Sequence, residues 1–267
     1  MVIRRIREHV AAQNWFAVAI DLAIVVVGVF LGTQANNWNA ARIEAEQGRS
    51  YRARLIDELD FNARQYRVQI AYYRHVRANG LAALAVLEGR AREPARDFLI
   101  HAYQLSQIDT GAAKTYIYDE MTSAGLVDRL GDEAIQATAS DYYRTLASNA
   151  PVLAETLPYR STIRQVMPYV AQHAIRDSCG DQFVYFGQRI IGTRLPKPCL
   201  ATIAPSEAEE GARIVRAHPG IAAEMTRYIA SLDEKIELLA INLDLTEKIK
   251  GALPGADQTA RKPLART

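Results

Sequence analysis

The sequence predicts an all-α protein. An N-terminal transmembrane helix is expected to continue into a long amphipathic helix, followed by an extramembrane helical bundle with room for one small hairpin. Three observations predict this class: an apolar run of membrane-spanning length, apolar residues at three- and four-residue steps through most of the remaining chain, and a single stretch with strand character. The 267 residues are 49% hydrophobic and 23% charged, a composition typical of a folded protein with a real core.

The membrane segment is predicted from residues 16–35, FAVAIDLAIVVVGVFLGTQA, which contain one charge, Asp21. A helix of this length spans ~30 Å, the thickness of a bilayer core. Trp15 and Trp38 are the only tryptophans and flank the run. An indole is apolar with one polar N–H, so it settles at the lipid–water boundary. The spacing therefore predicts a transmembrane helix over 15–38 with two interfacial anchors.

Two other interpretations of the apolar run remain open. A buried core helix of a soluble protein can be equally apolar, although paired tryptophans at this spacing argue against it. A cleaved signal peptide is the second. Thr33-Gln34-Ala35 is a poor cleavage site, and Asp21 would interrupt the apolar region. An uncleaved anchor is the interpretation that the residues favour.

The predicted orientation of the chain in the membrane rests on the basic residues that flank the apolar run and on the two cysteines. Basic residues stand on both sides of the run: Arg4, Arg5 and Arg7 before it, and Arg42, Arg49 and Arg52 after it. Cys179 and Cys199 lie twenty residues apart in a glycine- and proline-rich stretch. A disulfide between them would place the body outside the cytosol, whereas two unrelated thiols would say nothing. We expect a cytoplasmic N-terminus, residues 1–14, and a periplasmic body of a bacterial inner-membrane protein.

Small residues share one face of the predicted membrane helix. Gly28 follows Asp21 by two turns, Gly32 follows Gly28 by one, and Ala17 and Ala35 lie close to the same stripe. The G-x-x-x-G spacing lets two helices approach closely, which predicts a helix–helix interface through Gly28, Gly32 and Ala17 and a homo-oligomer. Asp21 on that face is a candidate ion or proton site, because carboxylates are costly in lipid. Chance spacing is the remaining alternative.

One long amphipathic helix is predicted after the membrane segment, from Asn39 to about Gly89. The alternative is two collinear helices with a weak point near Asn79-Gly80. Its predicted apolar face comprises Tyr51, Leu55, Leu59, Tyr66, Ile70, Tyr73, Leu81, Leu84 and Leu87. Its predicted solvent face carries Arg52, Arg54, Asp57, Glu58, Arg64 and Arg67. Because strict heptads are absent, a bundle helix is expected rather than a free coiled coil.

The remaining body, within 39–252, is expected to be helical. We predict helices over 97–108 and 115–127, one capped by Asp132 and running to Ser148, a turn at 149–151, and a helix from Pro151 to Asp177 bent at Pro168. Residues 182–193, with Gly187 as the turn, predict a hairpin. Ser206 is expected to cap a helix to Ala217, and Gly220 to begin the last one, which ends at Pro254. The polar segment 253–267 is expected to be a disordered tail.

Several function classes find no support in the sequence. The glycine-rich phosphate loop, the H-E-x-x-H and C-x-x-C metal motifs and the G-x-S-x-G elbow are all missing. His75, His101, His173 and His218 are far apart, so we expect neither a metal site nor a cofactor, and the catalytic set is expected to be empty. The net charge of +2 argues against nucleic acid as a partner.

Two segments carry a resemblance to a known family. The first is the membrane helix with Asp21 that ends in Asn36-Asn37-Trp38-Asn39; the second runs from Tyr118-Asp119-Glu120-Met121 through Ser123-Ala124-Gly125-Leu126 to Asp141-Tyr142-Tyr143. Over roughly residues 1–150 the chain resembles a bacterial family of single-pass membrane proteins with a domain of unknown function. It differs in having Asp at position 21 rather than Glu, in Ala124 rather than a second serine, and in its cysteine loop. The resemblance implies a helical body and no activity.

The function expected from these features is that of a membrane-anchored structural or interaction protein, and not of an enzyme. Its partners would be the lipid bilayer, further copies of the chain through the transmembrane helix, and a protein bound by the helical body. The alternative is an ion- or proton-conducting membrane subunit that uses Asp21. An enzymatic function would require the fold to bring the distant histidines and acidic residues together.

Overall fold

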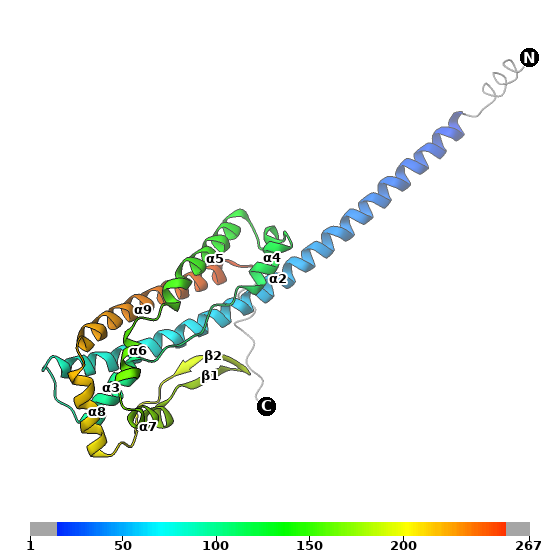
Figure 1. The fold of residues 1–267 in the computed structure, drawn as a ribbon. Helices are drawn as coiled ribbons and strands as arrows, with labels where there is room; N and C mark the ends of the chain where they lie inside the picture. Colours follow the sequence, from blue (N-terminus) through cyan, green and yellow to red (C-terminus); the bar gives the residue numbers. More distant parts are fainter. Residues whose placement is uncertain (1–14, 255–267) are drawn as a thin grey trace, which may run out of the picture. The chain divides into compact units, whose positions relative to one another are not determined.

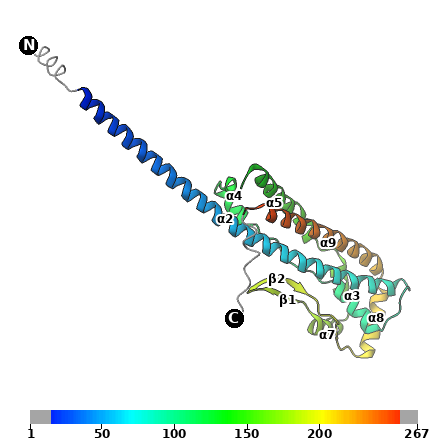
Figure 2. The same cartoon turned by 180° about the vertical axis from the view of Figure 1, so that it is seen from behind.

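The computed structural model describes residues 15–254, with side chains described from residue 19 onward (Figures 1 and 2). The protein is mostly helical with one two-stranded sheet, so the predicted helical class is confirmed at that level. Two compact units divide at Ser50, residues 1–50 and residues 51–267. The predicted cytoplasmic segment 1–14 lies outside the described residues, as do residues 255–267 of the predicted tail. Leu253, at the start of that tail, is buried.

Helix α2 runs from Trp15 to Leu87 without a break, so the weak point at Asn79-Gly80 is not realised. Gly80 serves close packing instead. A Cβ at this position would lie 2.5 Å from Leu105 Cδ1 and 3.0 Å from Ile229 Cγ1. Glycine therefore lets α2, the end of α3 (Ala95–Leu105) and α9 (Ile221–Ala252) approach this closely, whereas a side chain here would force Leu105 or Ile229 to shift.

The body, residues 51–254, is a helical bundle. Helices α5 (Glu133–Ala154) and α9 (Ile221–Ala252) lie side by side in both views, and α3 (Ala95–Leu105) packs on α8 (Pro205–Ala217). The shorter elements are α4 (Tyr116–Ser123), the 3₁₀ turn η1 (Val127–Arg129), α6 (Tyr159–Val166) and α7 (Tyr169–Cys179).

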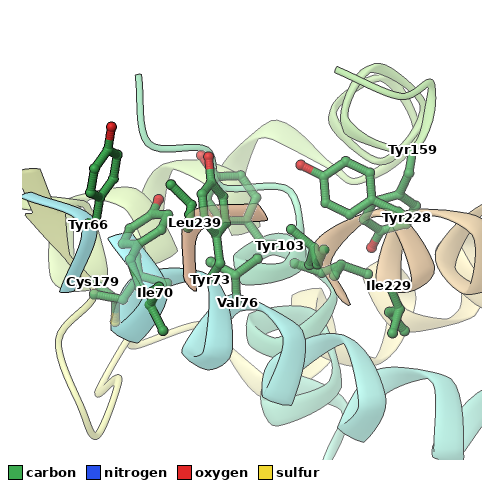
Figure 3. Close-up of a cluster of buried hydrophobic side chains, with 14 of the residues drawn as sticks. Tyr66, Ile70, Tyr73, Val76, Tyr103, Tyr159, Cys179, Tyr228, Ile229 and Leu239 are labelled. Atoms are coloured by element: carbon green, nitrogen blue, oxygen red, sulfur yellow. The ribbon is translucent and has the colours of Figure 1, made fainter. Parts of the chain in front are cut away.

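Tyrosine is prominent in the core of the body (Figure 3). Tyr66, Tyr103, Tyr142 and Tyr159 are among the largest fully buried side chains, together with Phe98. A buried tyrosine needs a partner for its hydroxyl. The Tyr159 hydroxyl donates to the Ala102 carbonyl at 2.7 Å. The Tyr159 ring thus fills the core while its polar end is tied to the backbone.

Several predicted boundaries are confirmed. Asp132 is the N-cap of α5, where its carboxylate accepts from the Ile135 N–H at 3.0 Å. Gly220 precedes α9 with φ +81°, a left-handed conformation that glycine adopts without strain. The last helix ends at Ala252, two residues before Pro254, close to the predicted end.

Other predicted boundaries are wrong. The turn at 149–151 does not form, because α5 continues through Pro151 to Ala154. Pro151 costs the helix one hydrogen bond, to the Ala147 carbonyl, and packing of α5 on α9 outweighs that loss. The break comes at 155–158 instead, and a second at Met167-Pro168 separates α6 from α7 where a bend was expected. Ser206 makes no cap; Pro205 occupies the first turn of α8.

Strands β1 (Gln182–Phe186) and β2 (Arg189–Arg194) form the predicted antiparallel hairpin. Gly187 lies in its turn with φ +60°. A register shift between Val184 and Tyr185 marks a bulge. Gly192 lies so close to α2 that a Cβ would be 2.8 Å from Val68 Cγ1, which places the hairpin against the part of α2 that belongs to the body.

Cys179, at the end of α7, and Cys199, beyond β2, form a disulfide with their Cα atoms 5.3 Å apart. Cys179 is completely buried. The cross-link therefore closes the chain around the hairpin and fixes both of its ends to the bundle.

Replacing both cysteines with alanine should lower the free energy of unfolding by about 3 kcal/mol, because the open loop regains conformational entropy in the unfolded chain. Denaturant titration of the full-length protein measures this change. Wild-type protein unfolded in the presence of a reductant should show the same loss. An unchanged transition midpoint in both samples would contradict a structural role for the bond.

Candidate functional site

Helix α2 carries the predicted membrane segment in the first unit. Among the described residues, one helix is long and apolar enough to cross a membrane, and none of its apolar window is buried in the structure. Leu22, Phe30 and Leu31 are each about three-fifths exposed, and Trp38 is 71% exposed. The helix backbone includes Trp15 and Ala17, but the side chains of both lie outside the described residues.

Gly28 and Gly32 lie on one face of α2, as the spacing predicts. A Cβ on either glycine would meet nothing within 4 Å. Asp21, on the same stripe, is exposed. These observations describe a small-residue face with open space beside it. The helix–helix interface and the ion or proton site at Asp21 stay predictions.

A row of polar side chains on α2 is the main feature of the body that the sequence analysis missed. Glu58 is 1% exposed, which corrects the prediction that placed it on the solvent face, and Asn62 and Gln69 are equally buried. Leu81, predicted on the apolar face, is 40% exposed. The other predicted apolar positions are buried or half-buried, and the polar row is buried beside them.

The polar row holds the segment between α3 and α4, residues 106–115, which we term the strap. The Asn62 amide donates to the Lys114 carbonyl and accepts from the Lys114 N–H, both at 2.8 Å. Gln69 Nε2 donates to the Gly111 carbonyl at 2.7 Å, and the Tyr73 hydroxyl donates to the Asp109 carbonyl at 3.0 Å. The strap has no regular structure of its own, and α2 supplies the partners that its buried backbone requires.

Asp109 links the strap to the hairpin. Its Oδ1 accepts from Gln69 Nε2 at 3.0 Å and from the Gly111 N–H at 2.8 Å. Its Oδ2 accepts from the Thr193 N–H at 2.9 Å and from the Thr193 hydroxyl at 2.8 Å. Four donors thus satisfy this buried carboxylate without a basic side chain.

Glu58 occupies the other end of the row. It accepts from the Ile117 N–H at the start of α4 and from the Tyr143 hydroxyl, each at 2.9 Å. Tyr143 also stacks on Tyr118, with ring centroids 4.0 Å apart. Burial raises the pKa of the Glu58 carboxyl, and the two hydrogen bonds oppose that rise only in part. Tyr118 and Tyr143, which belong to the segment that carries the family resemblance, thus stack beside a buried acid.

Two of the scattered histidines do converge. His75 and His101 line one cleft of about 380 Å³ together with Glu93 and Asp97. His101 Nδ1 lies 2.9 Å from Glu93 Oε2. Burial, with Lys197 second, lowers the pKa of His75. No group of three metal-ligating side chains occurs in the described part of the chain.

A second cavity lies between α2, the strap, α5 and α9. Its volume is about 330 Å³. Leu146, Leu153 and Leu239 form much of its wall, and Lys235 and Tyr66 contribute polar groups. Sequence patterns could not reveal this cavity, because its walls come from four segments far apart in the chain.

Comparisons with known proteins do not assign the chain to a family. No protein-family model matches the chain, and neither a curated protein nor a solved structure is significantly similar to it.

Replacing Glu58 with glutamine should flatten the pH dependence of stability. Since the folded pKa of Glu58 lies above its ordinary value of 4.5, the folded state binds the proton more tightly. Its stabilising contribution is complete below pH 4.5 and is lost as the pH rises through the folded pKa. Unfolding free energies measured across this range should therefore fall less with pH in the variant than in wild type.

The matched control is Glu209→Gln, at an exposed position of α8. It should reproduce the wild-type profile. Identical pH profiles for wild type and Glu58→Gln would show that burial does not perturb this carboxyl.

Proposed function

We propose that this protein is a single-pass, membrane-anchored interaction protein of the bacterial inner membrane, whose helical body lies on the periplasmic side. The observation that carries the proposal is the exposure of α2 over Leu22–Leu31. Ile24, Val25, Val26 and Val27 are all more than half exposed. Four consecutive residues cover every side of a helix, so no face of this segment is polar enough for water.

Lipid is the environment that fits such a segment. Leaving a leucine or valine in water instead of burying it costs about 1.5–3 kcal/mol. An unpacked helix apolar on all sides would therefore be a large liability in a soluble protein. The Cys179–Cys199 disulfide supports the periplasmic side, because such bonds persist in oxidising compartments.

The body is suited to binding another protein. Its hairpin exposes large apolar side chains: Phe183 60%, Tyr185 58% and Ile190 48%. Aromatic residues are enriched in protein interfaces. Self-association would use the other unit, where Gly28 and Gly32 leave room for a second helix.

The anchor can be tested by alkaline extraction of membranes. Wild-type protein should stay in the membrane pellet at its full-length mass. The double variant Val26→Arg, Val27→Arg should be released, because each charge at the helix centre costs about 2.5–3.5 kcal/mol of insertion. The control Asn37→Arg, Asn39→Arg adds the same charge at the end of the apolar run and should stay in the pellet.

Two results would contradict the anchor. Release of the wild-type protein by carbonate would show a peripheral or soluble chain. An intact mass that lacks the N-terminal segment would show a cleaved signal peptide.

Self-association can be tested by measuring the mass of the full-length protein in lipid nanodiscs. Gly28→Leu should lower the association constant of the oligomer at least tenfold, because the larger side chain prevents close approach of the two helices. Val26→Leu lies on the opposite face and should leave the mass distribution unchanged, as should Asp21→Asn. An oligomer that survives Gly28→Leu would exclude this face as the interface, and ion flux abolished by Asp21→Asn would instead support the conducting-subunit alternative.

A further inference from the structure

We propose that the cavity between α2, the strap, α5 and α9 binds a small amphipathic monocarboxylate, with the carboxylate at Lys235 and the apolar portion against the leucine-lined wall. The cavity lies entirely within the body, so the inference does not depend on the membrane anchor.

The size and lining of the cavity suit a small organic molecule. A volume of about 330 Å³ lies at the lower end of the range of small-molecule sites. Leu146, Leu153 and Leu239 present apolar surface, and Tyr73 adds a ring. Such a wall favours an aliphatic or aromatic portion of a ligand over a fully polar one.

Lys235 is the charged group of the cavity. Its side chain is only 6% exposed. Its ammonium donates to the Leu153 carbonyl at 3.0 Å and to the Glu155 carbonyl, which end α5. An ammonium has three donors, so one remains. No carboxylate forms an ion pair with Lys235 among residues 19–254, although Glu155 and Glu234 act on it from farther away.

A buried cation without a counter-ion is unfavourable, and a ligand carboxylate would supply the missing charge. The carbonyls that Lys235 contacts satisfy part of its hydrogen bonding but carry no net charge. An anionic ligand therefore gains more at this position than a neutral one of the same shape.

Tyr66 adds a second polar group to the cavity wall. Its side chain is 2% exposed, and its hydroxyl interacts with the Tyr142 hydroxyl. Because Tyr66 has this partner, Lys235 is the group that a ligand carboxylate would contact.

Two acidic residues also line the cavity. Both carboxylate oxygens of Asp109 are occupied by donors from Gln69, Gly111 and Thr193, so its charge is already stabilised. Glu155 is exposed, and water screens its charge. Neither therefore prevents an anion from reaching Lys235.

Access to the cavity runs past two exposed alanines, Ala112 on the strap and Ala150 on α5, which both line it. A large side chain at Ala150 would cover this opening without disturbing buried packing. Ala137 is equally exposed on α5 but does not line the cavity, so it provides a matched control.

The test uses the full-length protein in nanodiscs, titrated calorimetrically with 4-phenylbutyrate and with 4-phenylbutan-1-ol, which share the apolar portion and differ in charge. Heats measured with empty nanodiscs are subtracted to remove partitioning into lipid. The acid should bind with a stoichiometry of one, and the alcohol should bind at least tenfold more weakly.

Variants locate the site. Ala150→Trp should abolish binding of 4-phenylbutyrate, while Ala137→Trp should bind as wild type. Lys235→Met should also abolish binding, but it removes a cap from α5, so Ala150→Trp is the variant that separates loss of the cavity from loss of the fold.

Three results would overturn the proposal: no saturable heat above that of empty nanodiscs, equal affinity for the acid and the alcohol, or unchanged affinity in Ala150→Trp.

Discussion

The body of this protein depends on one constraint: an irregular segment packed inside a helical bundle must find hydrogen-bond partners for its backbone. The strap has no helix or strand to satisfy its own N–H and C=O groups. Side chains of α2, from Tyr73 back to Asn62, supply the hydrogen-bond partners of the strap instead. Since an unmade buried hydrogen bond costs about 1–3 kcal/mol, this arrangement decides where the strap lies.

Other features of the body follow from the position of the strap. Asp109 can reach Thr193 because the strap lies beside both α2 and the hairpin. The same segment forms one wall of the cavity whose opposite walls are α5 and α9. Lys235 ties α9 to the end of α5 by donating to the carbonyls that a helix terminus leaves free. Polar contacts thus position the elements, and the tyrosine-rich core fills the space between them.

The helical class, the hairpin and the caps at Asp132 and Gly220 could be predicted from sequence because each depends on neighbouring residues. Pro151 was misleading since its local preference was outweighed by packing of α5 on α9, which no local pattern records. Glu58 was misplaced for a related reason: helical periodicity separates polar from apolar residues and takes polar ones as exposed. The spacing of Glu58, Asn62, Gln65 and Gln69 at three and four residues was the available signal, but its meaning depends on a segment more than forty residues away.

Gly80 has a consequence for how this sequence can evolve. A side chain at position 80 would collide with Leu105 and Ile229, which come from two other helices. A larger residue can therefore be accepted there only if both partners become smaller or shift. Positions 80, 105 and 229 should vary together in any set of related chains, and a change at one of them alone should be selected against.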